Sequence, residues 1–146
     1  MADKNKIEKE SLCNIKKYSG AVLPSNYQNF VIARWLRSFR YGNDYIKLVD
    51  SDSYYEAYGR YVRNVLEQQS TIVRLAVLED NPDVAFGFSV SAGKVLHYVY
   101  VGLDYRNQGI GKHLVPIEVS EFTHLTKTGL KLWTSHAPKA KFNPFR

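Results

Sequence analysis

The sequence predicts a single domain of the α+β (α/β) class, with helices on both faces of a central mixed, mostly antiparallel sheet. Three observations support this prediction. Two segments with helical periodicity cover about residues 26–41 and 53–68, strand-like segments follow between residues 71 and 101, and a glycine-bearing turn leads into a third helical pattern. A chain of 146 residues, 45% of them hydrophobic, can bury one core. We therefore expect one folded domain over residues 13–146 after a flexible polar tail over residues 1–12.

The two N-terminal helices begin with similar signals. Ser25 and Gln28 have the spacing of a capping box, and apolar side chains then recur at helical intervals. Gly42 and Asn43 follow this pattern and predict the end of the helix, where a residue commonly has a positive φ. Ser53 and Glu56 form a second capping box before a stripe of tyrosines and valines.

The periodicity changes from helical to alternating after the second helix. Residues 71–78 and 84–90 are rich in β-branched and aliphatic side chains and flank a turn that contains acidic residues, Asn and Pro. Residues 94–101 then alternate regularly, and one face carries Val95, His97, Val99 and Val101. We expect these three segments to form an antiparallel meander.

A parallel strand is expected to complete the sheet. Apolar residues after Gly111 recur at helical spacing up to Gly129, and Pro116 fits such a helix only near its first turn. Residues 130–135 predict a short strand, and a helix between it and the preceding strand suits a parallel crossover. With a short first strand near residues 18–23, the predicted order is β-α-α-β-β-β-α-β.

Composition excludes several classes of protein. Cys13 is the only cysteine, so no internal disulfide forms and the reducing cytoplasm is the expected location. No apolar run approaches the roughly 20 residues that span a bilayer, so we expect no membrane partner. The four histidines lie far apart without zinc-site spacing, so we expect no metal. A net charge of +6 favours anionic partners such as nucleic acid, phosphate-bearing cofactors or acidic proteins.

A turn with the sequence DYRNQGIGK, residues 104–112, joins the third strand of the meander to the third helix. Gly109 and Gly111 let the backbone approach a ligand, and the first N–H groups of the helix lack partners within it. The helix dipole favours phosphate, and Arg106 and Lys112 add positive charge. The turn therefore predicts an anion site, and the alternative is that the two glycines only shape a strand-to-helix connection.

The segment VGLDYRNQGIGKHLV resembles the acetyl-CoA motif of the GNAT superfamily of N-acetyltransferases. That motif consists of Arg or Gln, two residues, Gly, one residue, and Gly or Ala, which correspond here to Arg106, Gly109 and Gly111. The predicted order of elements also matches the family through its fifth strand. The resemblance implies a GNAT-like fold, acetyl-CoA (CoA) as the cofactor, and transfer of an acetyl group to a primary amine of an unknown acceptor.

The resemblance also implies how acetyl-CoA is held. Main-chain N–H groups of the turn would bind the CoA pyrophosphate, and a bulge or splay would open the strand edge to the pantetheine arm. The same strand groups can polarise the thioester carbonyl. The implied cofactor-binding residues are Val99, Tyr100, Val101, Arg106, Asn107, Gln108, Gly109, Ile110, Gly111 and Lys112.

Acetyl transfer also needs a base for the amine. His97 is the candidate base, because some members of the family place histidine at this position and because an ordinary pKa near 6.5 suits neutral pH. The alternative is a core histidine that bonds to a backbone carbonyl. Val95 stands where many members have glutamate, which weakens the case for that chemistry.

The C-terminus departs from the pattern of the family. Complete members continue past the fifth strand with another helix, which often carries a tyrosine that protonates the thiolate, and with two final strands. The residues after His136 are few and include no tyrosine, so we expect the last helix and strands to be missing or replaced by the tail. Ser135 or His136, at the end of the predicted fifth strand, is the candidate substitute for the acid. Weak or absent activity is therefore an open alternative.

Three functional hypotheses follow. The first is the N-acetyltransferase, and the second is an inactive GNAT-like binding protein whose basic helices hold nucleic acid or a protein partner. The third is an acetyltransferase that modifies nucleic-acid bases, with tyrosines stacking on them. The arginines concerned, which also suit a solvated helix face, are Arg34, Arg37, Arg40, Arg60 and Arg63. The open edge of the last strand predicts docking of the tail or a homodimer.

Overall fold

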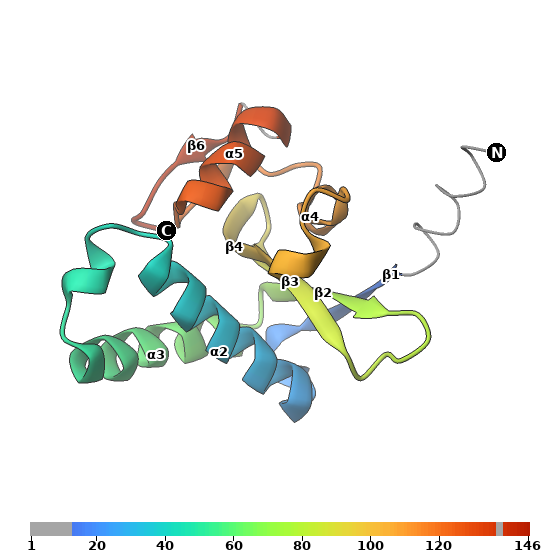
Figure 1. Ribbon diagram of the computed structural model, residues 1–146, viewed down its shortest axis with the longest axis horizontal. Coiled ribbons are helices and arrows are strands. Elements are labelled where there is room, and N and C mark those ends of the chain that lie inside the picture. Colours follow the sequence, from blue (N-terminus) through green and yellow to red (C-terminus); the bar gives the residue numbers. More distant parts are fainter. Residues whose placement is uncertain (1–12, 137–138) are drawn as a thin grey trace.

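The computed structural model describes residues 13–136 and 139–146 (Figure 1). The predicted tail over residues 1–12 lies outside the described residues. The strands are β1 (Cys13–Ser19), β2 (Thr71–Leu78), β3 (Ala85–Ala92), β4 (Val95–Val101), β5 (Glu121–Phe122) and β6 (Lys141–Phe142). The helices are α2 (Ser25–Tyr41), α3 (Ser51–Glu67), α4 (Ile110–Leu114) and α5 (Lys127–His136), with 3-10 turns at Gly20–Val22, Ile46–Leu48 and Leu103–Tyr105.

The described strands form one six-stranded sheet in the order β1-β2-β3-β4-β5-β6. Strands β1 to β4 are antiparallel, whereas β5 pairs parallel with β4 and β6 pairs parallel with β5. The predicted meander is therefore confirmed. A parallel strand follows it, but at Glu121–Phe122 and not at the predicted residues 130–135. The order of elements through β5 is the predicted one, and helices cover both faces of the sheet (Figure 1).

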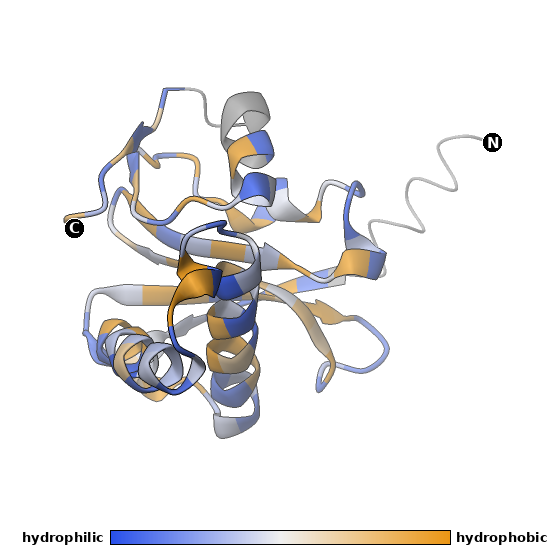
Figure 2. Ribbon diagram, turned by 60° about the vertical axis from the view of Figure 1, so that its left-hand side comes forward, coloured by the Kyte–Doolittle hydropathy of each residue, from blue (hydrophilic) through white to orange (hydrophobic). Residues whose placement is uncertain are grey.

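Helices α2 and α3 pack on one face of the sheet and form the main core. Trp35 of α2 is fully buried and stacks on Tyr98 of β4, with the ring centroids 5.2 Å apart. Alternate residues of β2, Val73, Leu75 and Val77, point into the same core. Figure 2 shows apolar residues along the strands and an alternation of apolar and polar residues along the helices, as expected for half-buried elements.

Helix α4 packs on the opposite face of the sheet. Ile110 and Leu114 contact Ala76 of β2 and Phe86 of β3 in a second, smaller core. This contact places the turn before α4 above the end of β4, where the predicted anion site begins.

The N-termini of the two long helices differ from the prediction. Helix α2 begins after Pro24, and no side chain caps it, so the predicted capping role of Ser25 is wrong. Helix α3 begins earlier than expected because the Asp50 carboxylate accepts a 3.1 Å hydrogen bond from the N–H of Ser53. Gly42 ends α2 with a φ of −85°, so the predicted positive φ is also wrong.

The first strand lies at Cys13–Ser19 rather than near residues 18–23. The chain leaves the sheet at Gly20, where a Cβ atom would lie 2.2 Å from the carbonyl oxygen of Leu66 at the end of α3. Only glycine allows this close approach, and the chain turns there into the short 3-10 segment.

Helix α4 is much shorter than the helix predicted to extend as far as Gly129. It ends at Leu114 because Pro116 offers no N–H and the residue before a proline avoids the helical region. Val115 accordingly has φ −82° and ψ 123°. The hydroxyl of Ser89 donates a 2.7 Å hydrogen bond to the carbonyl of Leu114, which satisfies one terminal carbonyl of the helix.

The segment predicted as the last strand, residues 130–135, belongs instead to helix α5. Thr126 begins this helix, because its hydroxyl accepts a 2.9 Å hydrogen bond from the N–H of Gly129 and its carbonyl accepts one of 2.8 Å from the N–H of Leu130. The parallel strand is the two-residue β5. A helix and the short strand β6 therefore follow β5, which corrects the expectation that the last helix is missing.

The C-terminal tail covers the edge of β5, whereas the predicted open edge was that of a strand over residues 130–135. The N–H of Asn143 donates to the carbonyl of Phe122 (2.9 Å), and the rings of Phe122 and Phe142 lie 5.4 Å apart. Nε of Arg146 lies 2.8 Å from the carboxylate of Glu121. The tail thus satisfies the strand edge within the chain, and the homodimer stays a prediction.

Candidate functional site

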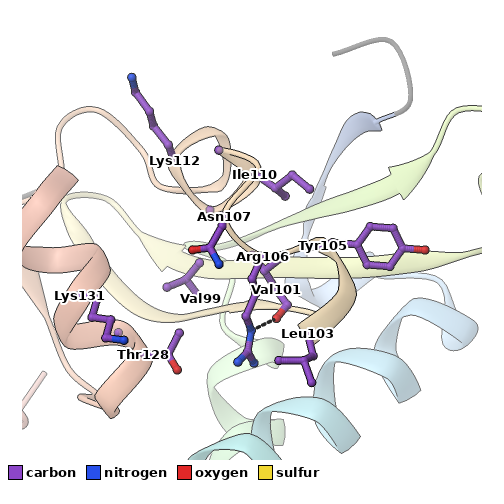
Figure 3. Close-up of a pocket in the computed structure, with 13 residues that line it drawn as sticks. Val99, Val101, Leu103, Tyr105, Arg106, Asn107, Ile110, Lys112, Thr128 and Lys131 are labelled. Carbon is purple, nitrogen blue, oxygen red and sulfur yellow. Dashed lines mark hydrogen bonds between the residues drawn. The ribbon is translucent and has the colours of Figure 1, made fainter. Parts of the chain in front are cut away.

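A cavity of about 440 Å³ opens between the end of β4, the turn before α4 and helix α5 (Figure 3). Of the residues predicted to hold a cofactor, those that line it are Val99, Val101, Arg106, Asn107, Gly109, Ile110, Gly111 and Lys112. Helix α5 adds Thr128, Gly129 and Lys131, and Figure 3 shows Thr128 and Lys131 across from Val99 and Arg106. The cavity therefore brings together most of the predicted cofactor residues and a helix that the sequence analysis did not place there.

The turn before α4 contains two left-handed residues. Asn107 has φ 64° and Gly109 has φ 80°. Left-handed residues in a tight turn bring successive N–H groups to one side, an arrangement called a nest that binds anions. A Cβ atom on Gly109 would meet no atom within 4 Å, so the left-handed backbone, and not crowding, selects glycine there. The turn therefore has the backbone of an anion site.

Strands β4 and β5 separate after two residues. Val95 pairs with Glu121 and Leu96 with Phe122, and the strands diverge beyond these pairs. Within the described chain, the edge of β4 over residues 99–101 has no strand partner. This is the splay that the resemblance implied for the pantetheine arm.

Along β4, the main-chain N–H and C=O groups of successive residues point alternately toward β3 and toward the opposite edge. The N–H of Gly102 donates a 2.7 Å hydrogen bond to the carbonyl of Phe86, so the carbonyl of the same peptide, that of Val101, points away from β3. It accepts a 2.8 Å hydrogen bond from Nε of Arg106, which Figure 3 marks with a dashed line. By the same alternation, the N–H and C=O groups of Val99 and Val101 point to the open edge.

Two of the predicted cofactor residues do not line the cavity. The Tyr100 ring packs in the main core against Phe30 and Phe88. Gln108 is exposed, and its amide donates to the carbonyl of Asp104 at 3.4 Å. The geometry thus supports main-chain binding along the turn and the edge but gives the side chains of Tyr100 and Gln108 no part in the cavity.

His97 is the extra residue of a β-bulge. The register of β3 against β4 shifts between Val90, which pairs with Tyr98, and Ser91, which pairs with Leu96. His97 is 6% exposed, and its Nδ1 lies 3.2 Å from the hydroxyl of Thr123. Burial lowers the pKa of His97, so the ring is neutral at neutral pH. It does not line the cavity. The bulge also interrupts the alternation predicted for residues 94–101, since Leu96 packs with Val99.

A second histidine, which the sequence analysis did not select, lies next to His97. The Nδ1 of His124 is 2.7 Å from the same Thr123 hydroxyl. Its ring is surrounded by the aromatic rings of helices α2 and α3 and strand β4, those of Trp35, Phe39, Tyr58, Tyr61 and Tyr98, here called the aromatic cluster. Burial and, to a smaller extent, His97 lower the pKa of His124 to about 4. No local motif marks this residue, because its partners come from distant parts of the chain.

Ser135 and His136, the predicted substitutes for an acid, do not lie at the end of a strand. They are the last residues of helix α5. The prediction rested on a strand over residues 130–135, which the helix begun by Thr126 replaces. Their side chains fall outside the described part of the structure.

The predicted basic helix face is only partly present. Arg34, Arg37, Arg60 and Arg63 are exposed. Arg40, in contrast, is 8% exposed and donates a 2.9 Å hydrogen bond to the carbonyl of Val49, so it belongs to the core and not to the basic helix face.

The tyrosines of helix α3 stack on one another. The rings of Tyr54 and Tyr58 lie 5.4 Å apart, and those of Tyr58 and Tyr61 lie 5.3 Å apart. Burial raises the pKa of all three hydroxyls, which stay neutral. Packing within the protein therefore accounts for them, and stacking on nucleic-acid bases receives no support from their arrangement.

The described residues contain neither a candidate metal site nor a candidate membrane-spanning helix. No group of three or more His, Cys, Asp or Glu side chains is placed to hold a metal ion there. None of the described helices combines the length and the apolar character that a bilayer crossing requires.

Comparison with solved structures identifies the fold. An aminoglycoside acetyltransferase from an uncultured soil metagenomic sample, solved in complex with sisomicin, is similar over 92% of this chain and 93% of that one, with a TM-score of 0.53 and 15% identity. YjaB from Escherichia coli, in its apo form, is similar over 70% of this chain at 20% identity, with a TM-score of 0.47, and the chain spans 61% of its length. The chain has the fold of the GNAT superfamily.

Sequence comparison alone finds no such relation. No known protein-family profile matches the chain, and no curated protein matches it. The likeness to the solved acetyltransferase is therefore a likeness of fold, in the arrangement of the elements.

Proposed function

We propose that this chain is an acetyl-CoA-dependent N-acetyltransferase that moves an acetyl group to a primary amine. The observation that supports it best is the position of the open edge of β4, over residues 99–101, beside the glycine turn over residues 106–111 on the wall of one cavity. The turn suits a pyrophosphate and the edge suits a chain that carries amide groups. Acetyl-CoA contains both groups in one molecule.

The residues present fit this cofactor. The N–H groups of the turn would bind the pyrophosphate, and Arg106 and Lys112 supply positive charge at the cavity. The main-chain groups of Val99 and Val101 at the open edge would hold the pantetheine arm. Lys131 of α5 lines the same cavity and adds a third cationic side chain. Bound acetyl-CoA supplies a thioester whose carbonyl carbon is open to attack.

The chain would promote the transfer in two ways. An N–H group at the β4 edge, that of Val99 or Val101, would stabilise the negative charge that develops on the thioester oxygen. His97, held neutral by burial, would accept the proton that the attacking amine loses. The C–N bond then forms as the C–S bond breaks, and the leaving thiolate takes a proton from solvent. Ser135 and His136 stay as predicted alternatives for this proton donor.

The acceptor is an amine, and the site does not determine which one. The metagenomic acetyltransferase of similar fold binds sisomicin, which makes aminoglycosides one class to test. The exposed Arg34, Arg37 and Arg63 on helices α2 and α3 disfavour a polycation and favour an amine that also carries negative charge. Both classes belong in the first acceptor screen.

A second candidate function is an inactive GNAT-like protein that binds nucleic acid or another protein. The exposed arginines favour it. Such a protein would bind nucleic acid with an affinity that falls steeply as salt increases.

The experiment that tests the proposed function is a calorimetric titration with acetyl-CoA and with CoA. The variant Gly109→Glu adds a negative side chain to the turn of the cavity, and we expect it to weaken binding by about 100-fold or more, equivalent to about 2.7 kcal/mol. Gly93→Glu is the matched control, because Gly93 also has a positive φ, 57°, and open space around it, but lies in the turn between β3 and β4. Both variants should lose similar stability, about 1–2 kcal/mol.

The outcomes separate the candidates. Binding that is lost in Gly109→Glu and kept in Gly93→Glu supports the cofactor site and justifies the acceptor screen. Equal binding by all three proteins would place the cofactor elsewhere, and no binding by the unmodified chain would refute the proposed function. Salt-dependent binding of nucleic acid in that case would favour the second candidate.

A further inference from the structure

The hydroxyl of Thr123 joins the two histidines near the fork of β4 and β5. It lies 3.2 Å from Nδ1 of His97, 2.7 Å from Nδ1 of His124 and 3.3 Å from the carbonyl oxygen of His97. Thr123 is 4% exposed, so this hydroxyl relies on these partners instead of water. The three contacts together determine where the protons are.

A carbonyl oxygen only accepts hydrogen bonds, so the single proton of the Thr123 hydroxyl goes to the carbonyl of His97. The hydroxyl then has no proton left for either ring, and both Nδ1 atoms must donate to it. Each neutral imidazole carries one N–H, so Nε2 of each ring is a bare acceptor. The contacts of both rings with the Thr123 hydroxyl are made through Nδ1.

As a whole residue, His124 is the more exposed of the two histidines. It is partly exposed, whereas His97 is 6% exposed. The indole N–H of Trp35 and the hydroxyl of Tyr58, in the aromatic cluster beside it, are buried near each other without a well-formed hydrogen bond.

We infer that Thr123 is a positioning residue that keeps the proton of His124 on Nδ1, so that Nε2 of His124 accepts the proton of the acceptor amine. The inference rests on the proposed function and extends it, since His124 replaces the buried His97 as the group that meets the amine. An ammonium group gives one proton to Nε2, which becomes N–H. The neutral amine then forms the C–N bond as the C–S bond of the thioester breaks, and the second proton that its nitrogen loses passes through solvent to the leaving thiolate. The imidazolium later releases the first proton to solvent.

The electrostatic surroundings of His124 agree with this role. The titratable groups that face it are His97 and Tyr98 on β4 and Tyr58 and Tyr61 on α3, and no charged side chain is in contact with its ring within the described chain. Burial keeps the ring neutral, so Nε2 is available at neutral pH. The same apolar surroundings lower the pKa of an ammonium group brought into them, which makes the transfer to a weak base less unfavourable.

The test compares Thr123→Val, which has nearly the same shape but no hydroxyl, with Thr123→Ser, which keeps the hydroxyl. NMR correlations between the imidazole nitrogens and the ring protons report the tautomers of His97 and His124 in the free protein. We expect the Nδ1–H tautomer of both in the unmodified chain and in Thr123→Ser, and its loss in Thr123→Val. An Nε2–H tautomer in the unmodified chain, or an unchanged tautomer in Thr123→Val, would overturn the inference.

A kinetic measurement tests the role of Nε2. Acetyl-CoA turnover is followed with a panel of primary amines, ethanolamine, 2-phenylethylamine, glutamate and sisomicin. We expect Thr123→Val and His124→Gln to lower kcat by roughly tenfold to hundredfold without changing the KM for acetyl-CoA, and Thr123→Ser to restore it. Unchanged kcat in both variants, or binding of acetyl-CoA without acetylation of any of these amines, would overturn the assignment to His124.

Failure of the proposed function looks different. If acetyl-CoA does not bind the unmodified chain, the proposed function falls and the catalytic role of His124 falls with it. The tautomers, measured without any ligand, would still decide whether Thr123 positions the two rings.

Discussion

Nε of Arg106 donates a 2.8 Å hydrogen bond to the carbonyl oxygen of Val101, which ties the glycine turn to the open edge of β4. The bond joins the two parts of the proposed cofactor site, and its donor is itself a residue of the turn motif. The Arg106 side chain therefore has two roles to separate, a tether for the turn and a positive charge at the cavity.

The variants Arg106→Gln and Arg106→Ala separate these roles. Glutamine keeps a donor for the Val101 carbonyl but removes the charge, so we expect acetyl-CoA to bind about tenfold more weakly, with a smaller dependence on salt. Alanine removes both, so we expect a larger loss. Calorimetry at low and high salt measures the difference, and binding by Arg106→Ala as tight as that of the unmodified chain would contradict both roles.

His124 predicts how stability depends on pH. Its pKa is about 4 in the folded chain, against a usual 6.5, chiefly because of burial. Between these two pKa values, His124 is protonated in the unfolded chain but neutral in the folded chain. The free energy of unfolding should therefore fall by roughly 3 kcal/mol as pH drops from about 6.5 to about 4. Above about pH 6.5 the residue should have no effect on this dependence.

Urea unfolding of the unmodified chain and of His124→Phe, between about pH 7 and about pH 4, measures this effect. The phenyl ring suits the aromatic cluster and does not titrate, so the variant should lose less stability on acidification. The lowered pKa values of His97, Asp44, Asp50 and Glu121 add a fall of the same sign in both proteins. Parallel curves for the two proteins would contradict the assignment.

The two phenylalanines of the tail should differ in their effect on stability. Phe142 is 46% exposed and contacts the ring of Phe122, whereas Phe145 is 93% exposed. We expect Phe142→Ala to lower the free energy of unfolding by about 1 kcal/mol and Phe145→Ala by less than about 0.5 kcal/mol. Thermal unfolding of both variants decides this, and equal losses would show that the tail does not protect β5 through Phe142.

Arg40 and Arg37 lie one turn apart on α2 but should not be equivalent. The guanidinium of Arg40 bonds the carbonyl of Val49 and lies 5.1 Å from the centroid of the Tyr54 ring. We expect Arg40→Ala to cost about 2–3 kcal/mol and Arg37→Ala less than about 0.5 kcal/mol. Chemical denaturation measures both losses. If Arg40→Ala were as stable as the unmodified chain, Arg40 would not contribute to the core and would count with the arginines of the basic helix face.

Local patterns predicted much of the fold. The alternation in residues 71–101 and the helical stripes before it were sufficient, because each pattern records which face of one element is buried. The same reasoning failed after Gly111, where apolar residues continue at helical spacing but Pro116 ends the helix. The backbone restriction that Pro116 imposes therefore decided where the helix ends, against the helical spacing of the apolar side chains.

The residues of the site also divide into those that local sequence predicts and those that it does not. The turn around Gly109 was predictable because an anion-binding turn is encoded within a few consecutive residues. Thr123 and His124 were not, because their roles depend on His97 and on the aromatic cluster, which meet them only in the folded chain. Lys131 was missed because its segment was assigned to a strand rather than to α5.

The fork of β4 and β5 has a consequence for how this chain can change over evolutionary time. The groups that it offers over residues 99–101 are peptide N–H and C=O groups, which nearly every amino acid possesses. Mutation can replace the side chains along this edge and leave what a ligand meets unchanged, provided that the strands still diverge. Selection on such a site acts on backbone shape, so related chains can drift until comparison of their residues finds nothing while their folds still superimpose.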